Sequence, residues 1–203
     1  MWSVTKNKRK SSKYQKPDWV KIVQQTTAEM MSSEFFENFK NQISLQNKDY
    51  KLVCLGLGSV SNSRSARHQL ALIGCLLDSF LNLKLGLVYD PAFEDEDLEI
   101  IQKIYPGVCL QAYENWKSEE NVLFYLPHIP LWLLDRIIST EKNNLEKNIF
   151  ISNNLFNVKE TQTKNGEFLE HNFKLFRKIA AKTTVSFEMR KGVEKYVGSF
   201  YIH

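Results

Sequence analysis

The residues of this chain that could do chemistry stand where short apolar runs end. Four such runs, KLVCL, KLGLVY, NVLFYL and NIFIS, are each followed by polar or glycine residues. In an open parallel sheet, ligands bind outside the carboxyl ends of the strands, so residues at these places can face one crevice. The candidate ligand-binding residues at the run ends are Gly56, Gly58, Ser59, Asp90, His128 and Asn153.

The turn Gly56-Leu57-Gly58-Ser59 lies between an apolar run and a helical pattern, which is where nucleotide-binding folds keep glycines. Without Cβ atoms, the backbone there can approach a phosphate or a cofactor closely. Asp90 ends the next run, where such folds place the carboxylate that accepts hydrogen bonds from ribose hydroxyls. The pattern indicates an adenosine-containing ligand, either S-adenosylmethionine or a nucleotide. It is incomplete, because Ser61 stands where the dinucleotide fingerprint has glycine, and a tight structural turn also explains both glycines.

Ser59, Asp90 and His128 occur in the chain order of an α/β-hydrolase triad, but the serine lacks the G-x-S-x-G elbow that would expose it. We therefore assign no catalytic residue, and the choice between an enzyme and a non-enzyme stays open with a leaning towards the latter. His128 is either ligand-binding or structural. Arg67 and Gln69, in the first turns of the following helix, either bind a phosphate or carboxylate or pair with an acid such as Asp95 or Asp97.

Nothing in the sequence predicts a metal site or names a cofactor. The remaining histidines lie at unrelated places, and the three cysteines show neither CxxC nor Cys/His metal spacing. Each cysteine sits inside an apolar run, which is typical of buried reduced thiols in a cytosolic or nuclear protein. The cysteines are Cys54, Cys75 and Cys109.

The elements that must position these residues alternate between strand and helix. Two helices are expected before residue 50, the second capped by Ser33. Alternating strands and helices imply crossovers, so we predict an α/β fold, a single Rossmann-like domain with a mostly parallel sheet and helices on both faces. The tail at 183–203 alternates like a hairpin or edge strands. The expected strands are 51–55, 84–89, 107–111, 121–126 and 148–152, and the expected helices are 63–80, 93–104, 130–140 and 167–182.

Composition and charge narrow the class of protein. With 203 residues, 43% apolar and 12% aromatic, the chain is long enough for one core and is neither fibrous nor wholly disordered. The net charge is +4, but residues 1–16 hold six basic residues and no acid, which leaves −2 for residues 17–203. We therefore expect a disordered basic leader at 1–16 and one domain at 17–203. Nucleic acid is disfavoured as a partner, and neither a signal peptide nor a membrane span is indicated.

Several blocks at these loops resemble the sensitivity-to-red-light-reduced (SRR-like) domain family over about residues 50–158. The matching blocks are Gly56-Leu57-Gly58-Ser59 to Ser63, Ala66-Arg67, Gln69-Leu70-Ala71-Leu72, Tyr89-Asp90-Pro91 with Phe93 and Asp97, Leu126-Pro127-His128, and Ile151-Ser152-Asn153.

The resemblance implies a regulator of circadian-clock input and of haem biosynthesis that acts through protein partners, in the cytoplasm and also in the nucleus, with no agreed reaction. Two departures bear on chemistry. Ile129 follows His128 where family members often have cysteine, which disfavours a Cys/His pair. Ser152 precedes Asn153 where they have glycine, so that loop is less able to approach a ligand.

Overall fold

The structure, a computed structural model, describes residues 16–45, 47–113, 119–141, 143–152, 185–187 and 200–202. Its elements follow one another in the alternation that the apolar runs predicted. The helices are α1 (Trp19–Met31), α2 (Glu34–Lys40), α3 (Arg64–Ser79), α4 (Asp95–Ile104) and α5 (Leu131–Thr140). The strands are β1 (Tyr50–Leu55), β2 (Leu83–Tyr89), β3 (Asn121–Leu126), β4 (Ile149–Ser152), β5 (Val185–Phe187) and β6 (Phe200–Ile202).

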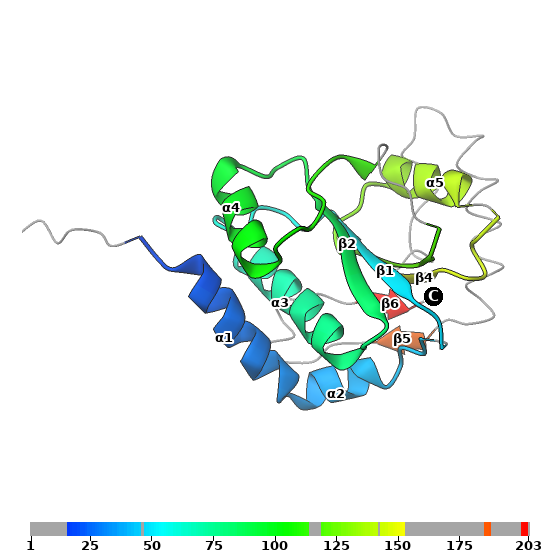
Figure 1. The fold of residues 1–203 in the computed structure, drawn as a ribbon, viewed down its shortest axis with the longest axis horizontal. Helices are drawn as coiled ribbons and strands as arrows, with labels where there is room; N and C mark the ends of the chain where they lie inside the picture. Colours follow the sequence, from blue (N-terminus) through cyan, green and yellow to red (C-terminus); the bar gives the residue numbers. More distant parts are fainter. Residues whose placement is uncertain are drawn as a thin grey trace, which may run out of the picture.

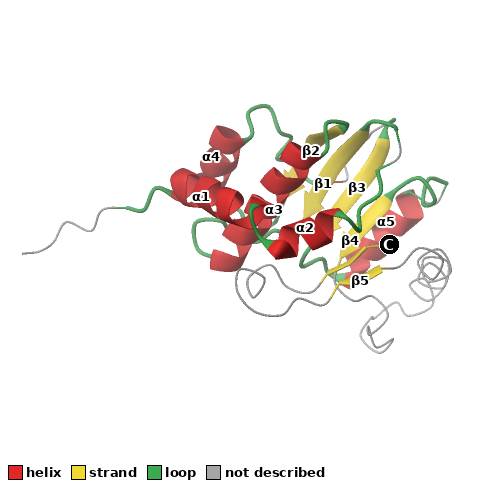
Figure 2. Ribbon diagram, turned by 90° about the horizontal axis from the view of Figure 1, so that it is seen from below, coloured by secondary structure: helices red, strands yellow, loops and turns green. Residues whose placement is uncertain are grey.

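The strands form one sheet in the order β2-β1-β3-β4-β6-β5. The first four run parallel to one another, and β6 pairs antiparallel with both β4 and β5. The chain passes from β1 to β2 on one side and later returns to β3 on the other side of β1 (Figure 2). The carboxyl ends of β1 and β3 are therefore the topological switch point, where Rossmann-like folds bind their ligands.

Helices cover both faces of the sheet, as predicted (Figure 1). On one face, buried side chains of α1, α2, α3 and α4 pack on inward residues of the strands, such as Leu52 and Tyr125. On the other face, Leu134 and Ile137 of α5 pack on alternate residues such as Val53. Because neighbouring residues of one strand serve opposite faces, the strands that lie between the layers read as continuous apolar runs.

Polar side chains cap the N-termini of the first three helices. Asp18, Ser33 and Ser63 precede α1, α2 and α3, and each accepts a backbone N–H three residues ahead, at 3.1 to 3.2 Å. Each bond satisfies a donor that the first helical turn leaves unpaired. The cap predicted at Ser33 is confirmed.

The strand predicted at 107–111 is wrong as a strand, because only Cys109 pairs, as an isolated bridge with Leu87. Gly107 turns there with φ of +82°, and the segment has a single neighbour at the outer side of β2. The helix predicted at 167–182, Asn153 and residues 1–15 of the leader lie outside the described residues. The expected edge pairing in the C-terminal tail is confirmed by β5 and β6.

Candidate functional site

The loop after β1 touches the loop after β3 through Gly56. This glycine has φ of +80°, and a Cβ atom built on it would lie 2.8 Å from the carbonyl carbon of His128 and 2.9 Å from its oxygen. An L side chain therefore meets both a strained backbone and a steric overlap at this position. Gly56 is needed because it lets the two strand-end loops close against each other at the switch point.

Asp90 joins the loop after β1 to the loop after β2. Its Oδ2 accepts the Gly58 N–H at 2.8 Å and its Oδ1 accepts the Ala92 N–H at 2.8 Å. The Gly58 amide that could have faced a phosphate thus points at a carboxylate of the protein itself. A carboxylate has about four lone-pair directions, so Asp90 retains acceptor capacity beyond these two bonds.

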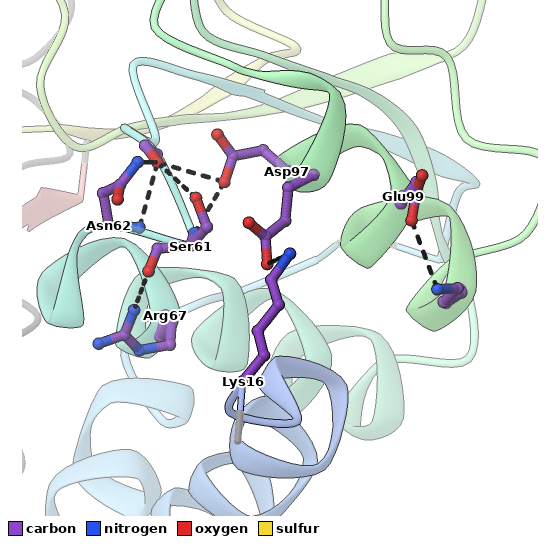
Figure 3. A network of polar contacts seen from close by, with 9 residues as sticks. Lys16, Ser61, Asn62, Arg67, Asp97 and Glu99 are labelled. Carbon is purple, nitrogen blue, oxygen red and sulfur yellow. Dashed lines mark hydrogen bonds and ion pairs between the residues drawn. The ribbon is translucent and has the colours of Figure 1, made fainter. Parts of the chain in front are cut away.

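Asp97 of α4 holds the next part of the same loop (Figure 3). The side chain is fully buried, and its Oδ1 accepts the Ser61 N–H at 2.7 Å and the Ser59 hydroxyl at 3.2 Å. Its Oδ2 accepts the Glu94 N–H at 3.0 Å, which closes the first turn of α4. Burial raises the pKa of this carboxyl, but the bonds from the Glu94 and Ser61 amides and the two serine hydroxyls together bring it below its ordinary value.

Arg67 of α3 bonds to the loop that precedes its helix, and anion binding by Arg67 stays a prediction. Its Nη1 donates to the carbonyl oxygens of Val60 at 2.7 Å and Ser61 at 3.1 Å, and the guanidinium lies 4.3 Å from the ring centre of Trp19 in α1. Desolvation and the nearby Arg64 lower the pKa of Arg67. An ion pair with Asp95 or Asp97, one of the two alternatives, does not occur in the described part of the chain. Arg67 therefore connects α1 to the loop.

His128 is exposed and makes its side-chain bond to α3. The distance between His128 Nε2 and Gln69 Nε2 is 3.0 Å, and Gln69 itself is buried. Within the described residues, no hydrogen bond joins Ser59, Asp90 and His128, so the three do not form a triad here. Nor do the described residues contain a group of three or more His, Cys, Asp or Glu side chains that could hold a metal ion.

The thiols agree with the expectation of buried cysteines in two of three cases. Cys54 and Cys75 are buried and Cys109 is half-buried, and all three are free. Burial raises the pKa of Cys75 to about 12, so its thiol stays protonated at neutral pH.

In the described helices we find no apolar segment of the length that crossing a bilayer requires.

Comparison with known proteins identifies the family. The model of the SRR1 domain matches residues 33–198, which is most of the chain and extends beyond the blocks at about 50–158. The chain belongs to the SRR1 domain family. An SRR1-like protein of Drosophila melanogaster is 33% identical over 139 residues, which cover 64% of this chain and 49% of that protein. The SRR1-domain chain thus spans about half the length of this curated relative.

Solved structures give weaker similarities. A mutant of MtNAS matches with a TM-score of 0.40 at 12% identity, covering 90% of this chain and 69% of the other. An O-methyltransferase from Bacillus cereus in complex with SAH matches with a TM-score of 0.39 at 12% identity, covering 94% of this chain and 91% of the other.

Asp97 and Gln69 were not among the candidate ligand-binding residues, and both are central to the site. Asp97 was considered only as a possible partner of Arg67 and as part of a family block, but it lies three residues before Ile100, on the buried side of α4. Gln69 lies three residues after Ala66 and four before Ile73, again on a buried helix face. A polar side chain at such a position must find a partner inside the protein, and that is the signal that could have identified both residues.

Proposed function

We propose that this SRR1-domain chain is a regulatory protein that acts through protein partners on circadian-clock input and haem biosynthesis, without a reaction of its own. The observation that supports this most is that polar side chains at the strand ends bond to the neighbouring loops. Asp90 and Asp97 accept loop amides, and Arg67 donates to loop carbonyls. Hydrogen bonds of this kind hold the strand-end loops in one conformation, and a surface of fixed shape suits a protein that partners recognise. The proposal places the protein in the cytoplasm and the nucleus.

The test is deletion and rescue in cells that express the protein. Deletion is expected to change rhythmic transcription or the haem level, and the wild-type chain is expected to restore it. Ser59→Ala and His128→Ala are expected to restore it as well, since neither a nucleophile nor a proton carrier is needed. Unchanged rhythm and haem after deletion would contradict the regulatory role. Failure of both variants, with circular dichroism showing that they fold, would instead indicate an enzyme.

A second candidate function is the binding of an adenosine-containing ligand at the switch point. It is favoured by the contact between Gly56 and His128, which brings the loops after β1 and β3 together where Rossmann-like folds bind nucleotides. Asp90 stands beside them with lone pairs left for ribose hydroxyls.

A thermal-shift panel of nucleotides, S-adenosylmethionine and S-adenosylhomocysteine tests this second function. A ligand at 100 times its Kd should stabilise the fold by about 2.7 kcal/mol. The shift should fall in Asp90→Ala and persist in the control Asp95→Ala, whose side chain is exposed. No shift with any compound at millimolar concentration, or an equal shift in Asp90→Ala, would exclude this candidate.

A further inference from the structure

One buried polar atom at the switch point lacks a partner among the described residues. Gln69 is only 1% exposed, and its Oε1 accepts no hydrogen bond within this part of the chain. A side-chain amide offers two N–H donors and a carbonyl acceptor, and buried groups of this kind are nearly always paired. Gln69 uses its amide nitrogen with His128 and leaves the oxygen beside it unused. A polar group kept in this state needs an explanation.

The position of Gln69 supplies one. Its amide extends from α3 to His128 in the loop after β3, and β3 is one of the two strands that flank the switch point. The ring of His128, which is exposed, contacts this amide, and its one side-chain hydrogen bond among the described residues is the bond to Gln69 Nε2. The His128 backbone is fixed against Gly56, whereas its side chain can rotate about its own Cα–Cβ bond. The ring can therefore leave Gln69 without any change in the loops.

We propose that Gln69 recognises the edge of an adenine ring, and that the His128 side chain is a displaceable cover that occupies this place when no ligand is bound. Glutamine pairs with adenine through two bonds, in which its Oε1 accepts from the N6 amino group and its Nε2 donates to N7. This pairing gives the unpaired oxygen its donor and replaces the bond lost when His128 leaves. The inference rests on the second candidate function and assigns its base-recognising residue.

The experiment uses the full chain and isothermal titration calorimetry, with adenosine, S-adenosylhomocysteine and inosine as probes. Inosine is the matched ligand, because a carbonyl replaces the N6 amino group and cannot donate to Gln69 Oε1. The protein variants are Gln69→Leu, His128→Ala and, as control, Gln102→Leu on the exposed side of α4. A good pair of bonds to a base discriminates by about 5- to 150-fold, which sets the effect to be looked for.

Adenosine is expected to bind the wild type and Gln102→Leu equally. It should bind Gln69→Leu at least about fivefold more weakly than it binds the wild type. Inosine should bind the wild type more weakly than adenosine does, by a similar factor. His128→Ala is expected to bind adenosine as tightly as the wild type or more tightly, because no cover has to be displaced. Without ligand, Gln69→Leu should unfold at the same or a higher temperature, since an unpaired polar atom is removed.

The failures can be told apart. If adenosine binds the wild type and Gln69→Leu equally, the base-recognising role is wrong while the ligand-binding function stands. Loss of binding in His128→Ala would make His128 a ligand contact and overturn its role as a cover. If neither adenosine nor S-adenosylhomocysteine binds the folded wild type, the second candidate function and this inference fall together. Should Gln69→Leu not fold, the comparison of adenosine with inosine on the wild type still decides.

Discussion

Replacing Asp97 with alanine tests the internal bracing of the strand-end loops most directly. The fully buried carboxylate accepts the backbone N–H groups of Ser61 and Glu94 and the hydroxyl of Ser59. Alanine removes both acceptor oxygens, and with them all three hydrogen bonds, and leaves the two amides to find other partners. The first turn of α4 loses its link to the loop after β1 at the same time.

The size of the effect follows from these bonds. Hydrogen bonds to a charged group contribute about 1.5–3 kcal/mol each, and they are not additive when they share one group. We therefore expect Asp97→Ala to lower the free energy of unfolding by about 3–5 kcal/mol. For a chain of this size, 1 kcal/mol shifts the melting temperature by about 2–4 °C, so the loss should be about 6–20 °C.

Urea denaturation followed by tryptophan fluorescence measures this loss. The control is Asp95→Ala in the same helical turn, which is exposed and should cost no more than about 1 kcal/mol through the helix dipole. The slope of the unfolding free energy against urea should stay the same in both variants. Equal and small losses, both below about 1 kcal/mol, would refute the bracing role.

The same group predicts a pH dependence. Because hydrogen bonds hold the pKa of folded Asp97 below its value of about 3.9 in the unfolded chain, the unfolded state binds more protons as the solution is acidified. The stability that Asp97 contributes is thus complete well above that value and is lost as the pH falls through the folded-state pKa. We expect the wild type to lose stability more steeply than Asp97→Ala below about pH 5. Parallel curves would contradict this.

Three further predictions concern the backbone and Arg67. Gly56→Ala should destabilise more than Gly107→Ala by about 1–3 kcal/mol, since both have similar positive φ but only Gly56 faces backbone atoms within 3 Å; equal urea midpoints would contradict the steric argument. Gly74→Ala should lower the melting temperature despite the better helix propensity of alanine, because its Cβ would lie 3.0 Å from the Tyr105 hydroxyl oxygen and 3.1 Å from Cγ2 of Thr27 in α1. Arg67→Met should speed hydrogen exchange in the loop after β1, since Arg67 donates to two carbonyls of that loop, and unchanged exchange would contradict this role.

The order of elements could be predicted from the sequence because apolar runs and caps act locally. The runs before Gly56, Asp90 and His128 became β1, β2 and β3 within a residue or two, and Ser33 caps α2. The segment at 107–111 shows the limit of this reasoning. Its apolar residues suit a strand, but strand formation also needs a partner on at least one side over several residues, and only Cys109 has one.

The roles of side chains within the site were harder to predict, because residue type does not determine which partner is nearest. Asp90 was expected to offer its oxygens to a ribose, which stays a prediction, and the sequence did not indicate that both oxygens also accept backbone amides. Arg67 had two alternatives in the sequence, an anion or an acidic side chain, and the structure shows a third, the carbonyls of its own loop. The partners are Gly58, Val60 and Ser61 of the loop after β1 and Ala92 of the loop after β2. Gly58 lies far from Asp90 in the sequence, so only the folded chain brings these two residues together.

The contacts of Arg67 also show which other segments of the chain support the conformation of the loop after β1. The ring of Trp19 in α1 supports Arg67, Arg67 holds the carbonyls of Val60 and Ser61, and Asp97 holds the Ser61 amide from the opposite direction. Trp19 lies before residue 33, where the match to the SRR1 domain begins. A fragment limited to the matched residues would keep Asp97 but lose the aromatic support of Arg67. The loop geometry of this chain therefore depends on a helix outside the matched domain, and α1 belongs in any variant used to study the switch point.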